Sequence, residues 1–199
     1  MPFLEGFIIG LGTLVFIGPV FFTLIQASLQ FGWKAGMSVA LGVISGDLLC
    51  VILYLYGLDQ FLKNPLFLNS FAIIGGLFLI SLGLKHIIRP ALMLEVQLAK
   101  QMDLATSFIK GFAINFINPF VFMVWAGIVL LAKTKFENPT DSFVFLGACL
   151  LAIFLTDSLK SVFAFQIKNI LSPIIIKTTF RLIGILMIGF GLRLLLYLL

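Results

Sequence analysis

Charged side chains are scarce in this chain. Lys, Arg, Asp and Glu supply only 11% of its 199 residues, whereas hydrophobic residues supply 61% and the mean hydropathy is +1.20. So few polar side chains cannot cover a water-facing surface, which excludes an ordinary soluble domain. The net charge of +5 is spread along the chain, so it indicates contact with lipid headgroups and no binding of nucleic acid.

Residue types that build catalytic and metal sites are also rare. There is one histidine, His86, and the two cysteines, Cys50 and Cys149, do not form a CxxC pair. The sequence contains no Gly-x-Ser-x-Gly, HExxH or GxxxxGK[ST] motif. We therefore predict that the protein is not an enzyme and holds neither a metal ion nor a cofactor. We interpret both cysteines as small apolar packing residues.

Long apolar runs make up most of the sequence. Six of them reach about 20 residues or more, which is enough to cross a bilayer as helices. They are about Phe3–Leu29, Ala35–Leu58, Leu66–Ile88, Thr106–Ala132, Ser142–Ile167 and Thr178–Leu198. Because the connections are short, we predict an all-α integral membrane protein of six transmembrane helices, with residues 1–199 as a single membrane domain. The first run has no basic segment before it, so we expect a retained span and not a signal peptide.

The Lys and Arg residues beside these runs are distributed unequally. Loops one, three and five carry eight of them with their flanks, and the opposite side of the membrane carries four. The positive-inside rule then places loops one, three and five in the cytoplasm and both termini outside. Loop three, Arg89–Ala105, is the longest connection. It forms either a short helix at the membrane interface or a solvated linker.

The third and sixth runs repeat one another. GLFLISLGLKHII (Gly76–Ile88) aligns without gaps to GILMIGFGLRLLL (Gly184–Leu196), and the alignment matches two glycines and a basic residue. Hydrophobicity alone does not explain such a match.

The remaining runs also correspond in pairs. The first and fourth runs share a helix break, at Gly18-Pro19 and Asn118-Pro119. The second and fifth runs share an acid near their middle, Asp47 and Asp157. We predict two three-helix repeats, about residues 1–90 and 106–199, joined by loop 89–105. Because three is odd, the second repeat has inverted topology, which is typical of secondary transporters that work by alternating access. An inverted repeat can also serve only to build a compact bundle.

Asp47 lies near the middle of the second run, where an ionised carboxylate facing lipid would be costly. It must therefore face the bundle interior, water or a cation. We predict that it relays protons or binds a substrate ammonium; the alternative is a buried acid that only fixes helix packing. Asp157 and Lys160 are three residues apart on one helix face, so we predict a structural ion pair.

The stretch INFINPFVF interrupts the fourth run with Asn115, Asn118 and Pro119. Proline lacks an N–H and frees the carbonyl about four residues earlier, near Asn115. The two amides and this carbonyl are tolerable at membrane depth only in a cavity or within protein. We predict that they form the substrate and proton-coupling site with Gly18, Pro19 and Asp47. The alternative is a pair of proline kinks that serve packing.

Several stretches together resemble the lysine-exporter family, which includes the threonine and homoserine effluxers. They are FIGPVFF (Phe16–Phe22), GWKAGMSVALGVISGD (Gly32–Asp47) and NFINPF in the fourth run, and the resemblance covers nearly the whole chain. It implies proton-driven export of amino acids or related small zwitterionic metabolites. It also implies a multi-pass position in the bacterial inner membrane, with the substrate, protons and lipid as partners.

Two positions depart from the family pattern. The family's Pro-Gly-Pro lands on Ile17-Gly18-Pro19, and Phe120 stands where many members have lysine after Asn-Pro. A cation that could hold a substrate carboxylate is therefore missing there. The resemblance implies the class of substrate and not its identity.

The sequence also leaves three other functions and a possible homodimer as alternatives. The alternatives are a thiol electron carrier that uses Cys50 and Cys149, an inorganic-ion exporter, and an intramembrane hydrolase in which Asp47 and Asp157 meet. Small residues on the second run, such as Gly42 and Gly46, allow close helix packing. We expect this packing within the chain, although the same face would also serve a homodimer.

Overall fold

The computed structural model describes residues 1–15, 18–57, 65–88, 103–166 and 173–196, and every regular element among them is helical. The elements are α1 (Pro2–Gly12), the 3-10 helix η1 (Thr13–Val15), α2 (Pro19–Phe31), α3 (Trp33–Leu55), α5 (Pro65–Ile88), α7 (Leu104–Phe116), α8 (Pro119–Lys135), α9 (Pro139–Gln166) and α10 (Pro173–Leu196). The all-α prediction is confirmed for these residues. Most of loop three, for which the sequence left a short interfacial helix and a solvated linker open, lies outside the described residues.

The helices have the lengths and surfaces of a membrane protein. Within the described residues, α3 and α9 are each long and apolar enough to cross a bilayer, and α7 with α8 forms a third candidate span that bends by 69°. The remaining apolar helices in this part of the chain are shorter. Large apolar side chains face outward, such as Met123, Leu130 and Phe163, which are 58%, 63% and 58% exposed. An apolar exterior of this kind is suited to lipid.

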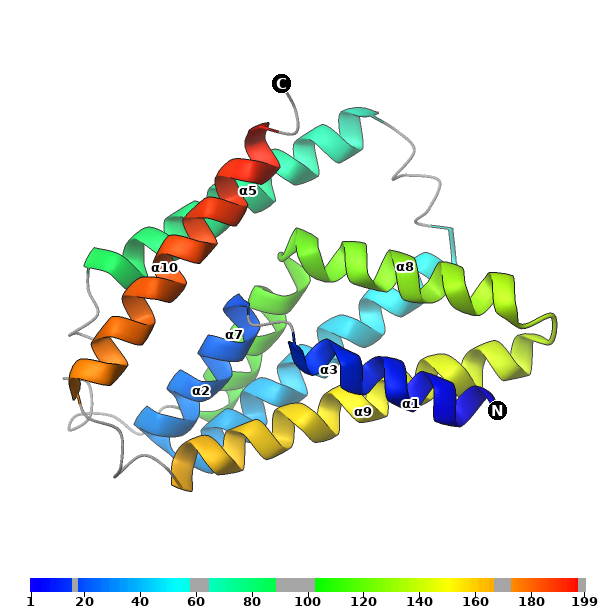
Figure 1. Cartoon of the computed structure of the whole chain (residues 1–199), viewed down its shortest axis with the longest axis horizontal. Helices are drawn as coiled ribbons and strands as arrows, with labels where there is room; N and C mark the ends of the chain where they lie inside the picture. Colours follow the sequence, from blue (N-terminus) through cyan, green and yellow to red (C-terminus); the bar gives the residue numbers. More distant parts are fainter. Residues whose placement is uncertain (16–17, 58–64, 89–102, 167–172, 197–199) are drawn as a thin grey trace.

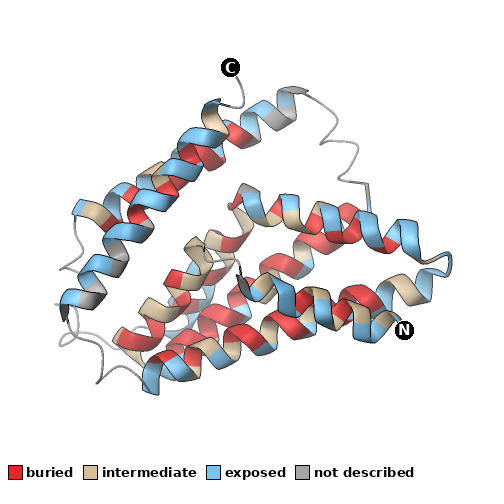
Figure 2. Cartoon of the chain, viewed as in Figure 1, coloured by how far each residue is buried: buried red, intermediate tan, exposed pale blue. Residues whose placement is uncertain are grey.

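The long helices α3 and α9 form the centre of the fold. Helix α7 packs along α3, α1 packs along α9, and α3 and α9 pack against each other (Figure 1). Helix α2 contacts α3, α7 and α9. Helices α5 and α10 lie side by side, and Phe22, Leu79 and Met187 pack together where this pair meets α2. Buried residues occupy the helix faces that look toward neighbouring helices (Figure 2).

The largest buried cluster lies where α3, α8 and α9 meet. Trp125 and Phe145 are 1% and 0% exposed there. The hydroxyl of Tyr54 donates a hydrogen bond to the Phe122 carbonyl at 2.8 Å, which satisfies the polar end of a buried aromatic side chain. Aromatic packing thus joins the second half of the fourth run to α3.

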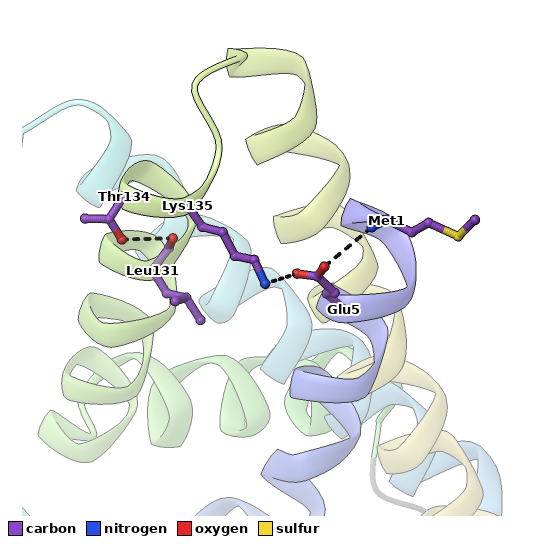
Figure 3. Close-up of polar contacts among 5 residues, drawn as sticks. All are labelled: Met1, Glu5, Leu131, Thr134 and Lys135. Carbon is purple, nitrogen blue, oxygen red and sulfur yellow. Dashed lines mark hydrogen bonds and ion pairs between the residues drawn. The ribbon is translucent and has the colours of Figure 1, made fainter.

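Polar contacts gather at the end of the bundle where α1 begins and α8 ends. Glu5 accepts from the terminal amine of Met1 at 3.4 Å and forms an ion pair with Lys135 (Figure 3). Lys133 donates from Nζ to the Tyr54 carbonyl at 3.3 Å. Charged side chains at helix ends are expected where a membrane meets water.

Paired glycines bring α5 and α10 together. A Cβ built at Gly83 would lie 2.6 Å from the Gly184 carbonyl oxygen, and one at Gly184 would lie 2.6 Å from the Gly83 oxygen. Gly76 and Gly191 face each other in the same way, at 3.0 Å and 2.7 Å. The two helices therefore cross at backbone-to-backbone distance, which no larger residue would permit.

Glycines also set the spacing of the two helix pairs in the centre. A Cβ at Gly10 of α1 would lie 2.6 Å from the Cys149 carbonyl oxygen on α9. A Cβ at Gly111 of α7 would overlap with the Val39 carbonyl oxygen on α3, and one at Gly42 of α3 would overlap with the Phe108 carbonyl oxygen on α7. The close packing predicted for Gly42 thus occurs within the chain.

We predict that Gly42→Ala lowers the free energy of unfolding by about 1–3 kcal/mol, because the added methyl group forces α3 away from α7. Gly147→Ala is the matched control, since a Cβ at Gly147 of α9 has no neighbour within 4 Å. Thermal unfolding of the detergent-purified variants measures both effects. Equal stability of the two variants would contradict the close α3–α7 contact.

Candidate functional site

Asp47 is buried in the interior of the bundle and is 4% exposed. Its Oδ1 accepts one hydrogen bond from Asn115 Nδ2 at 2.9 Å and another from Trp125 Nε1 at 2.7 Å. Asn115 Nδ2 also donates to the Val43 carbonyl at 2.9 Å. Hydrogen bonds to an ionised acceptor are stronger than neutral ones. A single carboxylate oxygen on α3 thus joins that helix to both α7 and α8.

Both donors use the same oxygen of the carboxylate. Within the part of the chain that the structure describes, Asp47 Oδ2 has no hydrogen-bond partner. A carboxylate offers about four acceptor positions on its two oxygens. Oδ2 can therefore take up a proton or accept a hydrogen bond from an ammonium group.

Gly46 makes room for the amide that holds Asp47. A Cβ at Gly46 would lie 3.0 Å from Asn115 Nδ2 and 3.4 Å from Asn115 Cβ. A larger residue would push Asn115 away from α3 and lengthen its hydrogen bond to Asp47. The Gly46-Asp47 dipeptide therefore combines a space and an acceptor on one turn of α3.

The break between α7 and α8 has its polar groups largely satisfied by the chain itself. We predicted that Pro119 would leave the Asn115 carbonyl free, but this carbonyl accepts from the backbone N–H of Asn118 at 3.2 Å. Asn118 is 3% exposed, and its Oδ1 accepts from the backbone N–H of Phe120 at 3.1 Å. Asn118 thus caps α8, and Pro119 occupies the first helical position, where no N–H is needed.

The break before α2 also places a proline at the start of a helix, but the residue before it has no side chain to cap the helix. Gly18 is extended, with φ −136° and ψ −172°, and Pro19 begins the helix. The Phe22 backbone N–H donates to the Gly18 carbonyl at 3.3 Å. Both α2 and α8 therefore begin with proline after an extended residue, and each helix start carries a partial positive charge. Ile17 lies outside the described residues.

Asp157 and Lys160 lie together on α9. Lys160 Nζ donates to Asp157 Oδ1 at 2.9 Å, and the two side chains are 16% and 8% exposed. Lys160 Nζ also lies 5.7 Å from the ring centre of Phe21, in the first turn of α2. Asp157 on α9 and Asp47 on α3 belong to two helices that pack against each other. Among the described residues, no hydrogen bond joins the two carboxylates.

The other candidate residues form no hydrogen bond with Asp47 in the described part of the chain. Cys50 and Cys149 are fully buried free thiols, and Cys149 Sγ donates to the Gly6 carbonyl at 3.0 Å. In the described ranges, no three His, Cys, Asp or Glu side chains gather as metal ligands do. His86 is buried, and its Nδ1 lies 2.7 Å from the Leu82 carbonyl oxygen on the same helix.

Trp125 is a residue of this group that no sequence motif marks. A hydrogen bond joins Asp47 and Asn115, which the sequence named as candidate site residues, and Trp125 completes their hydrogen-bond group. The indole N–H of a buried tryptophan usually has a hydrogen-bond partner, and this rule could have pointed to Trp125. In the described residues, Asn118 does not form a hydrogen bond with Asp47. Gly18 and Pro19 lie at the start of α2, and this helix packs against α3 and α7, which carry Asp47 and Asn115.

The model of the LysE type translocator family matches residues 11–198. The chain belongs to the LysE type translocator family. Comparisons with curated proteins and with solved structures gave no match. The family assignment makes this translocator a membrane transport protein and not an enzyme, and it indicates transport of amino acids or related compounds. The resemblance to the lysine-exporter family is thereby confirmed.

We predict that Trp125→Phe lowers the free energy of unfolding of this translocator by about 1.5–3 kcal/mol, the usual value of a hydrogen bond to a charged group. The ring stays in the core and only the donor to Asp47 is lost. Trp33→Phe is the matched control, because the Trp33 side chain is 43% exposed. In an Asp47→Ala background, Trp125→Phe should cost much less; an equal cost in both backgrounds would contradict the hydrogen bond.

Proposed function

We propose that this translocator is a secondary transporter that exports amino acids or related small zwitterions across the bacterial inner membrane in exchange for protons. The observation that carries the proposal is Asp47, a buried carboxylate held through one oxygen while the other has no partner in the described residues. An ionised carboxylate in an apolar interior is costly unless a proton or a cation compensates it. A proton and a substrate ammonium therefore compete for Asp47, which couples their movements.

The helix contacts support six spans arranged as an inverted repeat. The sequence aligns Gly76 with Gly184 and Gly83 with Gly191. Under this alignment, the contact between Gly76 and Gly191 becomes the contact between Gly184 and Gly83, and both are present. Two such equivalent contacts are expected when a pseudo-twofold axis runs between α5 and α10. Such an axis relates the two repeats of a transporter that opens alternately to either side of the membrane.

The central helix pairs give a second line of support. When Asp47 is aligned with Asp157, Val39 aligns with Cys149. The Val39 carbonyl faces Gly111 of α7, and the Cys149 carbonyl faces Gly10 of α1. Each repeat thus contributes the first part of its broken span to the acid-bearing helix of the other repeat.

The hydrogen bonds of Asp47 connect the binding of a proton or a substrate ammonium at this residue to the bend in the fourth span. Asn115 precedes the break and Trp125 follows it, and both donate to Asp47 Oδ1. An ionised Asp47 therefore holds α7 and α8 in one orientation on α3. A proton on Asp47 removes the negative charge that strengthens these bonds, which lowers the cost of a different bend. Asn118 and the backbone at Gly18 would add polar contacts to the substrate beside that of its ammonium with Asp47.

The Glu5–Lys135 ion pair joins the start of α1 to the end of α8 in this conformation. The positive-inside rule places this end outside the cell. If substrate leaves at this end, the start of α1 and the end of α8 would separate. An exposed ion pair is a weak contact, worth about 0–1 kcal/mol, so it does not prevent such an opening.

We predict that Asp47→Asn abolishes the exchange of L-amino acids for protons in proteoliposomes with an imposed pH gradient, because Asn cannot carry the exchanged proton. Asp103→Asn makes the same chemical change at an exposed carboxylate that caps α7, where Asn also caps well, so it should transport normally. Wild-type rates in Asp47→Asn, at normal protein levels, would show that the site assignment is wrong.

We also predict that Asn118→Ala slows this transport, and a second variant separates binding from capping. Loss of the cap alone costs about 1 kcal/mol of stability. Asn118→Ser keeps a capping oxygen but loses the amide. A slow Asn118→Ser of normal stability supports a substrate contact at Asn118, whereas full activity limits Asn118 to its role as a cap.

A further inference from the structure

Helix α2 carries a row of polar side chains along one face. Thr23, Gln26 and Gln30 follow one another at spacings of three and four residues, so they lie on the same side of the helix. All three are half-buried. Thr23 Oγ1 donates to the Pro19 carbonyl at 2.9 Å, and Gln26 Nε2 donates to Gln30 Oε1 at 3.4 Å. Contact with lipid would be costly for two amides, so this polar row is suited to water or to a polar ligand.

The packing of α2 determines where the polar row faces. Phe22 packs with Leu79 of α5 and Met187 of α10. Leu24 and Ala27, on another face, pack with buried residues of α3. At about 100° per residue, the polar row lies between these two faces of α2. The row therefore borders the junction between the α5–α10 pair and the remaining helices.

The polar row leads from the end of α2 to the depth of Asp47. Helices α2 and α3 join at Gly32 and pack against each other. Asp47 lies fifteen residues after Gly32, and Pro19 lies thirteen residues before it, so the break and the acid are at nearly the same depth. Gln30 lies eleven residues after Pro19. That distance is about 16 Å along a helix, which is half of a typical hydrocarbon core.

Helix α8, the counterpart of α2 in the second repeat, does not have this row. When the prolines that begin the two helices are aligned, the three polar positions correspond to Met123, Ala126 and Leu130. Met123 and Leu130 are 58% and 63% exposed, which suits contact with lipid. A helix in this position therefore folds without polar residues at these places, so the row serves something other than helix packing.

We propose that Thr23, Gln26 and Gln30 line the path by which the substrate enters from the cytoplasm and reaches Asp47. The inference rests on the proposed export of small zwitterions and names the face of α2 along which they move. The positive-inside rule places the turn at Gly32 in the cytoplasm. Hydroxyl and amide groups donate and accept hydrogen bonds, so they replace lost water around both an ammonium and a carboxylate. Being neutral, they hold neither group as tightly as an opposite charge would.

Labelling of single cysteines tests the path without any substrate. In a background of Cys50→Ser and Cys149→Ser, Thr23→Cys is compared with Leu41→Cys, which lies equally far from Gly32 on α3 and is 45% exposed. The probe is a membrane-impermeant cationic thiol reagent, added to the cytoplasmic side of membrane vesicles. We expect Thr23→Cys to react about 100-fold faster, because a charge is disfavoured in the hydrocarbon around Leu41→Cys. Equal rates, or faster labelling of Thr23→Cys from the opposite side, would overturn the inference.

A transport assay gives a second test that leaves the native cysteines in place. Gln26→Leu with Gln30→Leu replaces the amides by apolar side chains, which a membrane helix tolerates. Gln26→Asn with Gln30→Asn is the matched control, because it keeps both amides. We expect the leucine variant to exchange L-amino acids for protons about 10-fold more slowly than the wild type, as for a lost hydrogen bond to a charged group, and the asparagine variant to keep most of the rate. A wild-type rate in the leucine variant, at normal protein levels, would count against the path.

The two tests separate this inference from the proposed function. If the wild type exchanges no amino acid, the proposed function fails; faster labelling of Thr23→Cys then still supports a polar path along α2, and equal labelling overturns it. If the wild type transports amino acids and Asp47→Asn does not, while Thr23→Cys reacts no faster than Leu41→Cys, only the inference on α2 is wrong.

Discussion

The arrangement of the polar interior depends on two hydrogen bonds to one oxygen of Asp47. Asn115 on α7 and Trp125 on α8 supply them, and together they make a carboxylate tolerable inside an apolar bundle. The second oxygen keeps its capacity to accept. The same residue thus fixes the packing of three helices and remains able to exchange a proton for a cation. The two interpretations of Asp47 that the sequence left open, helix packing and transport, are therefore compatible.

Close backbone packing makes these hydrogen bonds reachable. The amide of asparagine is short, so it can span from α7 to Asp47 only if the two helices nearly touch. Gly42 and Gly111 allow that approach, and Gly46 leaves the space in which Asn115 lies. The glycines of α5 and α10 act in the same way in the other helix pair. Small residues therefore serve both the spacing of the helices and the geometry of the site.

The sequence predicts the helical class, the positions of both breaks and the buried acids, because lengths of apolar runs, prolines and charges are local features. It does not predict which side chains meet. Trp125 resembles the many aromatic residues that face lipid or core until its partner on α3 is known, and the cap at Asn118 depends on the local turn. The Asn115 carbonyl, expected to be free, is satisfied by the Asn118 N–H through a tighter turn. The pairing of Asp157 with Lys160 follows from helical spacing, but the nearby Phe21 comes from another helix.

The central claim is that substrate and proton compete for Asp47. Proton release on substrate binding tests it most directly, measured in weakly buffered detergent solution with a pH indicator. Adding an amino acid to the wild type should release protons over the pH range in which Asp47 is protonated without substrate, and the same addition to Asp47→Asn should release none, because Asn neither carries the proton nor compensates the ammonium. Substrate binding without proton release at every pH, or equal release in Asp47→Asn, would contradict it.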